Sequence, residues 1–97
     1  MSKESELEGK AYYYSLVNEY LGTGQTGRAL IQAIKNIAYN EGDPLAYINR
    51  ARVYEELGSL TTAILELQEA LRISPGNENA TACLERIQKK LSESVSG

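Results

Sequence analysis

The chain has 97 residues, the size of a single domain. Its 13 acidic and 10 basic residues are interspersed and give a net charge of −3, so we expect no nucleic-acid or anionic-lipid partner. Histidine is absent, which removes the commonest general base and metal ligand, so we predict no enzyme, no metal site and no cofactor.

The sequence also bears on the compartment. The first ten residues, MSKESELEGK, are polar and acidic, and they lack the basic-then-apolar order of a signal peptide. No run of about 20 mostly apolar residues is present, so we expect no membrane insertion. The single Cys83 excludes an internal disulfide and fits a reducing compartment. We therefore expect a cytoplasmic protein, and the start at Met1 with two polar ends favours a whole chain.

Two helical patterns occupy the first half of the chain. Residues 1–9 alternate charge with Ser and form a polar lead-in. From Lys10 the apolar residues recur at i, i+3, i+4, i+7 and i+8, which is the spacing of one helix face. Gly24 helps to end this helix, and a second helix is expected from about Gln25 to Tyr39. The apolar stripe of the first helix is Tyr13, Leu16, Val17, Tyr20 and Leu21.

A third and a fourth helix follow. Asp43 can cap a helix and Pro44 tolerates the first helical position, so a third helix should begin here. Gly58 ends the third helix, and Ser59 is expected to cap a fourth helix over residues 60–73.

The last part of the chain predicts a closing helix. Pro75 and Gly76 break the fourth helix, and Asn77 can cap a fifth over residues 78–91. Residues 92–97 are polar and are expected to form a flexible tail. No alternating strand pattern is present, so the predicted class is all-α with five helices.

The first two predicted helices overlay the next two at an offset of 34 residues, which is an internal repeat. The matched pairs are Tyr13 and Tyr47, Tyr20 and Tyr54, Gly24 and Gly58, Ala29 and Ala63, Leu30 and Ile64, and Ile37 and Leu71. This pattern resembles the tetratricopeptide repeat family. The second unit supplies the fullest match, with Tyr47, Ala51, Tyr54, Gly58, Ala63, Leu67, Ala70 and Pro75.

The resemblance implies an α-solenoid of antiparallel helix pairs over residues 10–91. Its parts would be a first repeat at 10–43, a second at 44–77 and a capping helix at 78–91. The first unit departs from the pattern, because Val17 and Asn36 stand where small residues are expected. Arg50 is also unusual, since its equivalents one period away are Leu16 and Leu84. Either the Arg50 stem packs while its head reaches water, or the position faces solvent.

In the family that the sequence resembles, the first helix of each unit lines a concave groove. Amide side chains can bond a peptide backbone, Arg can bind a carboxylate and Tyr offers rigid contact area. The alternative is an ordinary solvated helix face. A carboxylate clamp is not expected, because Tyr14, Asn79 and Cys83 occupy its basic positions. The predicted groove residues are Tyr14, Asn18, Leu21, Ile48, Asn49, Arg52, Glu56 and Arg86.

The predicted function is a protein–protein interaction module, such as an adaptor, an assembly factor or a chaperone, that binds a peptide or helix of a partner. The alternative is a self-associating repeat unit that forms homo-oligomers, because solenoids usually need three or more repeats and capped ends. Such an association would occur through the open N-terminal edge, which Tyr12 is expected to face, or through the capping helix.

Overall fold

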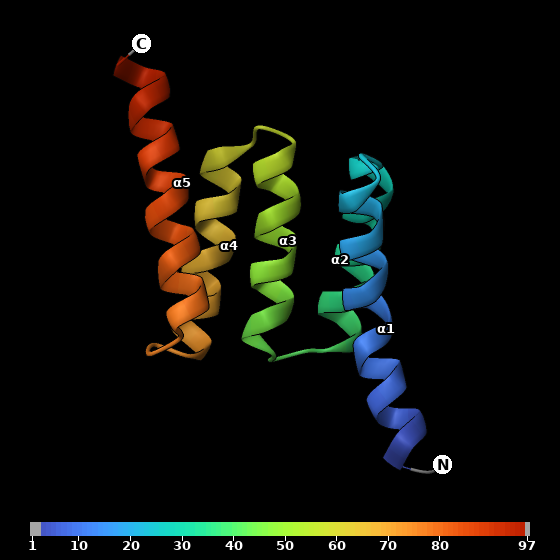
Figure 1. Cartoon of the computed structure of the whole chain (residues 1–97). Helices are drawn as coiled ribbons and strands as arrows, with labels where there is room; N and C mark the ends of the chain where they lie inside the picture. Colours follow the sequence, from blue (N-terminus) through green and yellow to red (C-terminus); the bar gives the residue numbers. More distant parts are fainter. Residues whose placement is uncertain (1–2, 97) are drawn as a thin grey trace.

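The computed structural model describes residues 3–96, and the side chains of residues 11–95. Figure 1 shows helices that stand side by side in chain order. Their bounds are α1 Lys3–Gly22, α2 Thr26–Tyr39, α3 Pro44–Glu56, α4 Leu60–Ile73 and α5 Glu78–Ser96. The described part of the chain contains no strand, so the prediction of an all-α fold with five helices is confirmed.

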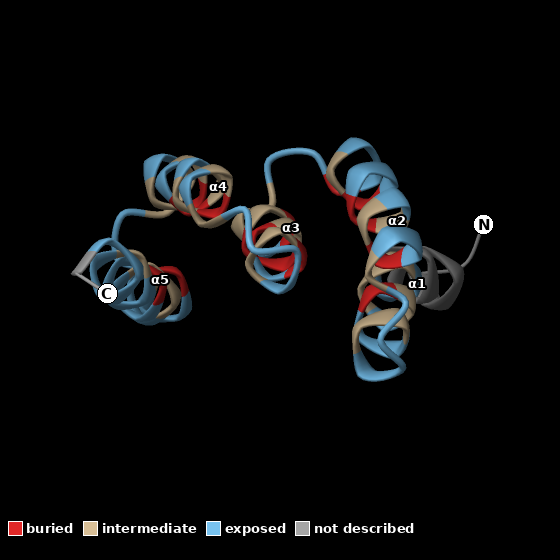
Figure 2. Cartoon of the chain, turned by 90° about the horizontal axis from the view of Figure 1, so that it is seen from above, coloured by how far each residue is buried: buried red, intermediate tan, exposed pale blue. Residues whose placement is uncertain are grey.

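The helices form two rows. Each helix packs against the next one in the chain, and α3 also contacts α1 and α5. Viewed along the helices, α3 and α5 lie in one row and α4 in the other (Figure 2). The molecule is accordingly thin, with extents of 53 × 31 × 17 Å. Buried residues face the neighbouring helices, because each pair leaves an apolar stripe that only the next helix can cover.

The turns follow from local chemistry. Gly24 and Gly58 adopt φ of 74° and 79°, a left-handed conformation that side chains disfavour, so both turns of the repeat depend on glycine. Asp43 caps α3 as predicted, since its Oδ1 accepts the Leu45 amide at 3.0 Å. Asn77 caps α5 in the same way, through the Ala80 amide at 3.0 Å. Ser59 precedes α4 but its side chain makes no capping bond, so that prediction is wrong.

Both terminal helices are longer than the sequence analysis predicted. α1 begins at Lys3, so the lead-in is helical from there, and α5 continues to Ser96 instead of ending at 91. The predicted flexible tail is thus helical over 92–96. The cause is the absence of a strong helix breaker in either segment, together with local bonds such as the one from Ser94 Oγ to the Leu91 carbonyl at 2.9 Å.

The main core lies between α3, α4 and α5. Leu67 and Ile87 are its largest fully buried side chains. Small residues on α3 and α4 let these two helices approach closely, and Tyr47 and Tyr54 pack at the margin of the cluster. The fully buried small residues of this cluster are Ala51, Ala63, Ala70 and Ala80. A second cluster of Val17, Ala29, Ala33 and Val53 joins α1 and α2 to α3.

Asn36 breaks the small-residue pattern of the first unit, and the structure shows why this is tolerated. Its side chain is fully buried between α2 and α3. Its Nδ2 donates to Asn49 Oδ1 at 3.4 Å, and its Oδ1 accepts a bond from Asn40 Nδ2. No buried side-chain nitrogen or oxygen among the described residues lacks a partner. The first helix pair therefore joins the second through a satisfied polar contact as well as through the apolar cluster that includes Val53.

Arg50 neither reaches bulk water freely nor packs as an apolar residue. Its Nε and Nη2 donate to the two carboxylate oxygens of Glu66 on α4, each at 2.9 Å. Both side chains are largely buried. This bidentate pair ties the two helices of the second unit together and explains an arginine at a position where the other units have leucine.

Candidate functional site

An open groove of about 490 Å³ lies across the row of odd-numbered helices. It is formed by the C-terminal half of α1, the C-terminal half of α3 and the middle of α5. α3 supplies its floor, because it contacts both α1 and α5. The lining residues are Asn18, Leu21, Gly22, Arg52, Glu55, Glu56, Arg86 and Lys90.

The structure brings five of the eight predicted groove residues together in this lining. They come from three helices that are distant in sequence, and the spacing within each helix placed them on one stripe. These five are Asn18, Leu21, Arg52, Glu56 and Arg86.

Ile48 and Asn49 do not line the groove, so the prediction was wrong for both. Their exposed fractions are 4% and 3%. Ile48 belongs to the core between α3, α4 and α5, and Asn49 bonds Asn36 on α2. The cause is the rotation of α3, which has neighbours on both sides, so that the first half of its predicted groove stripe is buried against them.

Tyr14 also leaves the candidate set, for a different reason. It is half-buried, and its hydroxyl donates to Asp43 Oδ2 at 2.8 Å. Burial raises the pKa of the Tyr14 hydroxyl above its ordinary value, and the hydrogen bond to Asp43 and the charge of that carboxylate add to this effect. Tyr14 thus ties α1 to the capping residue of α3, a structural role that the sequence pattern did not suggest.

Glu55 and Lys90 are lining residues that the predicted set lacks. Glu55 is only 8% exposed at its side chain, and it accepts bonds from Arg86 Nε at 3.1 Å and Arg86 Nη2 at 2.7 Å. Lys90 Nζ donates to the same carboxylate. The sequence held a partial signal, since Lys90 follows Arg86 by one helical turn and Glu55 follows Arg52 by three residues on the same face.

These contacts determine the charge state of the groove. The bond from Arg86 is the main cause that lowers the pKa of Glu55 to about 2; burial opposes it, and the bond from Lys90 contributes to the lowering. The carboxylate in turn raises the pKa of Arg86. Glu55 is therefore charged and already satisfied at neutral pH, so it anchors α5 on α3 and holds two cations at the groove wall.

Arg52 differs from the other groove cations because its partner is neutral. Its Nη1 donates to Asn18 Oδ1 at 3.0 Å, across the interface between α1 and α3. Both side chains are exposed. The amide orients the guanidinium without neutralising it, so Arg52 keeps its charge and several N–H donors for another molecule.

The Glu55 contacts predict a pH-dependent stability. The pKa of Glu55 is near 2 in the fold and 4.5 ordinarily, so its contribution is present above about pH 4.5 and is lost as the pH falls through about 2. Glu55→Gln should therefore lower the free energy of unfolding by about 1–2 kcal/mol at pH 7, since the half-exposed cations are screened by solvent.

Urea denaturation at several pH values between 7 and 3 measures this effect. The gap between wild type and Glu55→Gln should narrow below pH 4.5. The control Glu56→Gln removes an exposed carboxylate from the same helix and should change the free energy of unfolding by less than about 0.5 kcal/mol at pH 7. A gap that stays constant down to pH 3 contradicts the prediction.

The described residues offer neither a metal site nor a membrane-spanning helix. Among the residues that the structure describes, no group of three or more acidic, Cys or His side chains could hold a metal ion. None of the described helices is long and apolar enough to cross a membrane.

The comparisons with known proteins establish the fold. No protein-family model matches the sequence, and no curated protein sequence matches it. A solved structure described as the Arabidopsis OM64 TPR domain superposes with a TM-score of 0.79, over 91% of this chain and 73% of that one, at 20% sequence identity. The chain therefore has the tetratricopeptide-repeat-like fold of helix pairs that its sequence pattern predicted.

Proposed function

We propose that the chain is a non-catalytic binding module that holds a segment of a partner protein in the groove between α1, α3 and α5. The observation that carries the proposal is the convergence of Asn18, Arg52 and Arg86 from three helices around one open hollow. We also propose a cytoplasmic location, because the single Cys83 fits a reducing compartment.

The chemistry of the groove suits a polar peptide with an apolar side chain. Arg52 offers donors to a carboxylate or a backbone carbonyl, and Asn18 can both donate and accept. Leu21 provides apolar surface in the lining of the hollow. Glu56 is exposed beside these donors and would repel a carboxylate placed next to it. The groove therefore favours a ligand whose carboxylate lies at Arg52 and away from Glu56.

Peptide selection tests the proposal without knowledge of the partner. The chain would be immobilised and used to select peptides from a random 12-residue display library, and the enriched peptides would be measured by fluorescence anisotropy. Arg52→Glu should weaken their binding by about tenfold or more, because it removes donors and introduces a repulsive charge.

Arg72→Glu is the matched control, since it makes the same substitution at an exposed arginine of α4, outside the groove. It should leave the affinity of the selected peptides within about twofold, which is a surface-mutation effect. The groove assignment fails if the peptides bind the Arg52→Glu variant as tightly as the wild type while both variants remain folded by circular dichroism.

A further inference from the structure

The exposed side of α2 is more apolar than that of the closing helix α5. α2 exposes Ile31, Ile34 and Tyr39, each at about half or more of its surface. At the other end of the array, Val95 near the C-terminus is the one large apolar side chain that α5 exposes among the described residues. One end of the array is therefore closed by a polar helix and the other is not.

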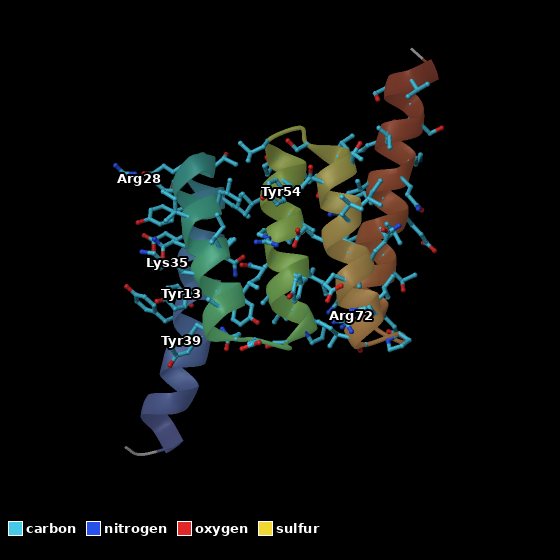
Figure 3. The ribbon with its side chains drawn as sticks, turned by 180° about the vertical axis from the view of Figure 1, so that it is seen from behind. Tyr13, Arg28, Lys35, Tyr39, Tyr54 and Arg72 are labelled. Atoms are coloured by element: carbon cyan, nitrogen blue, oxygen red, sulfur yellow. The ribbon has the colours of Figure 1, made fainter. Side chains whose placement is uncertain are left out.

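Aromatic side chains of α1 extend this apolar surface. Tyr12 is more than half exposed and lies against Tyr13, with ring centroids 5.2 Å apart. Tyr13 in turn lies 5.5 Å from Tyr39 of α2. Both spacings are typical of stabilising aromatic pairs, so the three rings form a fixed cluster with exposed flanks. Figure 3 shows Tyr13, Tyr39, Arg28 and Lys35 along the same edge, away from α3.

Two cations share this edge, and no described side chain forms an ion pair with either. Arg28 and Lys35 are seven residues apart, which places them on one face of α2 about 10.5 Å from each other along the axis. Neither forms an ion pair with any side chain in the described part of the chain. In contrast, Arg50, Arg72 and Arg86 each bind a glutamate.

Together these residues form a patterned strip, which we call the outer α2 face: Arg28, Ile31, Lys35 and Tyr39, flanked by Tyr12. We propose that the outer α2 face binds an acidic amphipathic helix of a partner protein. Such a helix would carry two carboxylates two turns apart and aliphatic residues between them, which matches the cation–apolar–cation order of the strip. This site is separate from the groove between α1, α3 and α5.

Charge decides between this occupant and the alternatives. Two copies of the chain that met through this face would bring four unpaired cations together, which opposes the homo-oligomer that the sequence allowed. An anionic membrane is also a poor match, because two cations are fewer than surface-binding helices use and the whole chain carries a charge of −3.

Synthetic peptides test the proposal directly. One 18-residue helical peptide would carry Glu at two positions seven apart with Leu between them, and a second would have Lys in place of both Glu. Fluorescence anisotropy should show the acidic peptide binding at least about tenfold more tightly. Lys35→Glu should weaken the acidic peptide about tenfold and strengthen the basic one, while Lys89→Glu, the same change at an exposed lysine of α5, should alter neither.

Each other outcome overturns the proposal. If the two peptides bind equally, or if Lys35→Glu and Lys89→Glu have equal effects, binding does not depend on the charge of the outer α2 face. Loss of acidic-peptide binding in Arg52→Glu would place that peptide in the groove, which supports the proposed function and rejects this second site. Sedimentation velocity showing a dimer that Ile31→Ser abolishes would make a second copy the occupant, and binding only to phosphatidylserine vesicles would make it a membrane.

Discussion

Replacing Leu67 by alanine is expected to lower the free energy of unfolding by about 2–5 kcal/mol. Leu67 is 0% exposed and lies in the cluster that joins α3, α4 and α5. Its truncation removes buried apolar area and leaves a cavity that small neighbours such as Ala51 and Ala70 cannot fill. Because a domain of this size is stable by only about 5–15 kcal/mol, much of the total would be lost.

Leu65→Ala is the matched control for this prediction. It makes the same substitution on the same helix, two residues away, at a side chain that is 60% exposed. Its effect on the free energy of unfolding should stay within about 0.5 kcal/mol. Urea denaturation followed by circular dichroism measures both variants, and similar midpoints for the two would contradict the position of Leu67 in the core.

Replacing Asn49 by alanine is expected to cost about 1–3 kcal/mol of stability, although the sequence pattern placed this residue at a ligand site. Asn49 Oδ1 accepts a hydrogen bond from the fully buried amide of Asn36. The substitution leaves that amide without one of its acceptors in a place that water does not reach. The contact between α2 and α3, and so between the two helix pairs, is the part of the fold that should weaken.

Asn18→Ala is the matched control for Asn49→Ala, because it makes the same substitution at an exposed position. Asn18 is exposed in the groove, so its loss should change the free energy of unfolding by less than about 0.5 kcal/mol. The same variant should weaken peptide binding, because Asn18 orients Arg52. If Asn49→Ala proves as stable as Asn18→Ala in urea denaturation, the buried amide pair does not contribute as described.

The groove shows how far a helix stripe can be predicted. Spacing alone put Asn18 and Leu21 on one face of α1, and Arg52 and Glu56 on one face of α3, and the groove contains all four. The same spacing put Ile48 and Asn49 on that stripe of α3, and both are buried. Periodicity defines which residues share a face, whereas the width of the face left uncovered depends on how the neighbouring helices pack.

The sequence by itself determined the number of helices, their order and most of their ends. Those features depend on local signals, such as the positive φ at Gly24 and Gly58 and the capping side chains of Asp43 and Asn77, which act within a few residues. The 34-residue period then predicted the stacked architecture, because each helix pair needs the next to cover its apolar side.

Only the tertiary structure decided the partners of the polar side chains. Tyr14 bonds Asp43 across 29 residues, and Glu55 binds Arg86 across 31. Residue type and spacing do not specify such pairs, because they depend on the rotation and the offset of two separate helices. The physical reason is that helix ends follow short-range backbone chemistry, whereas the site arises where three helices meet, and their meeting is set by the packing of the core.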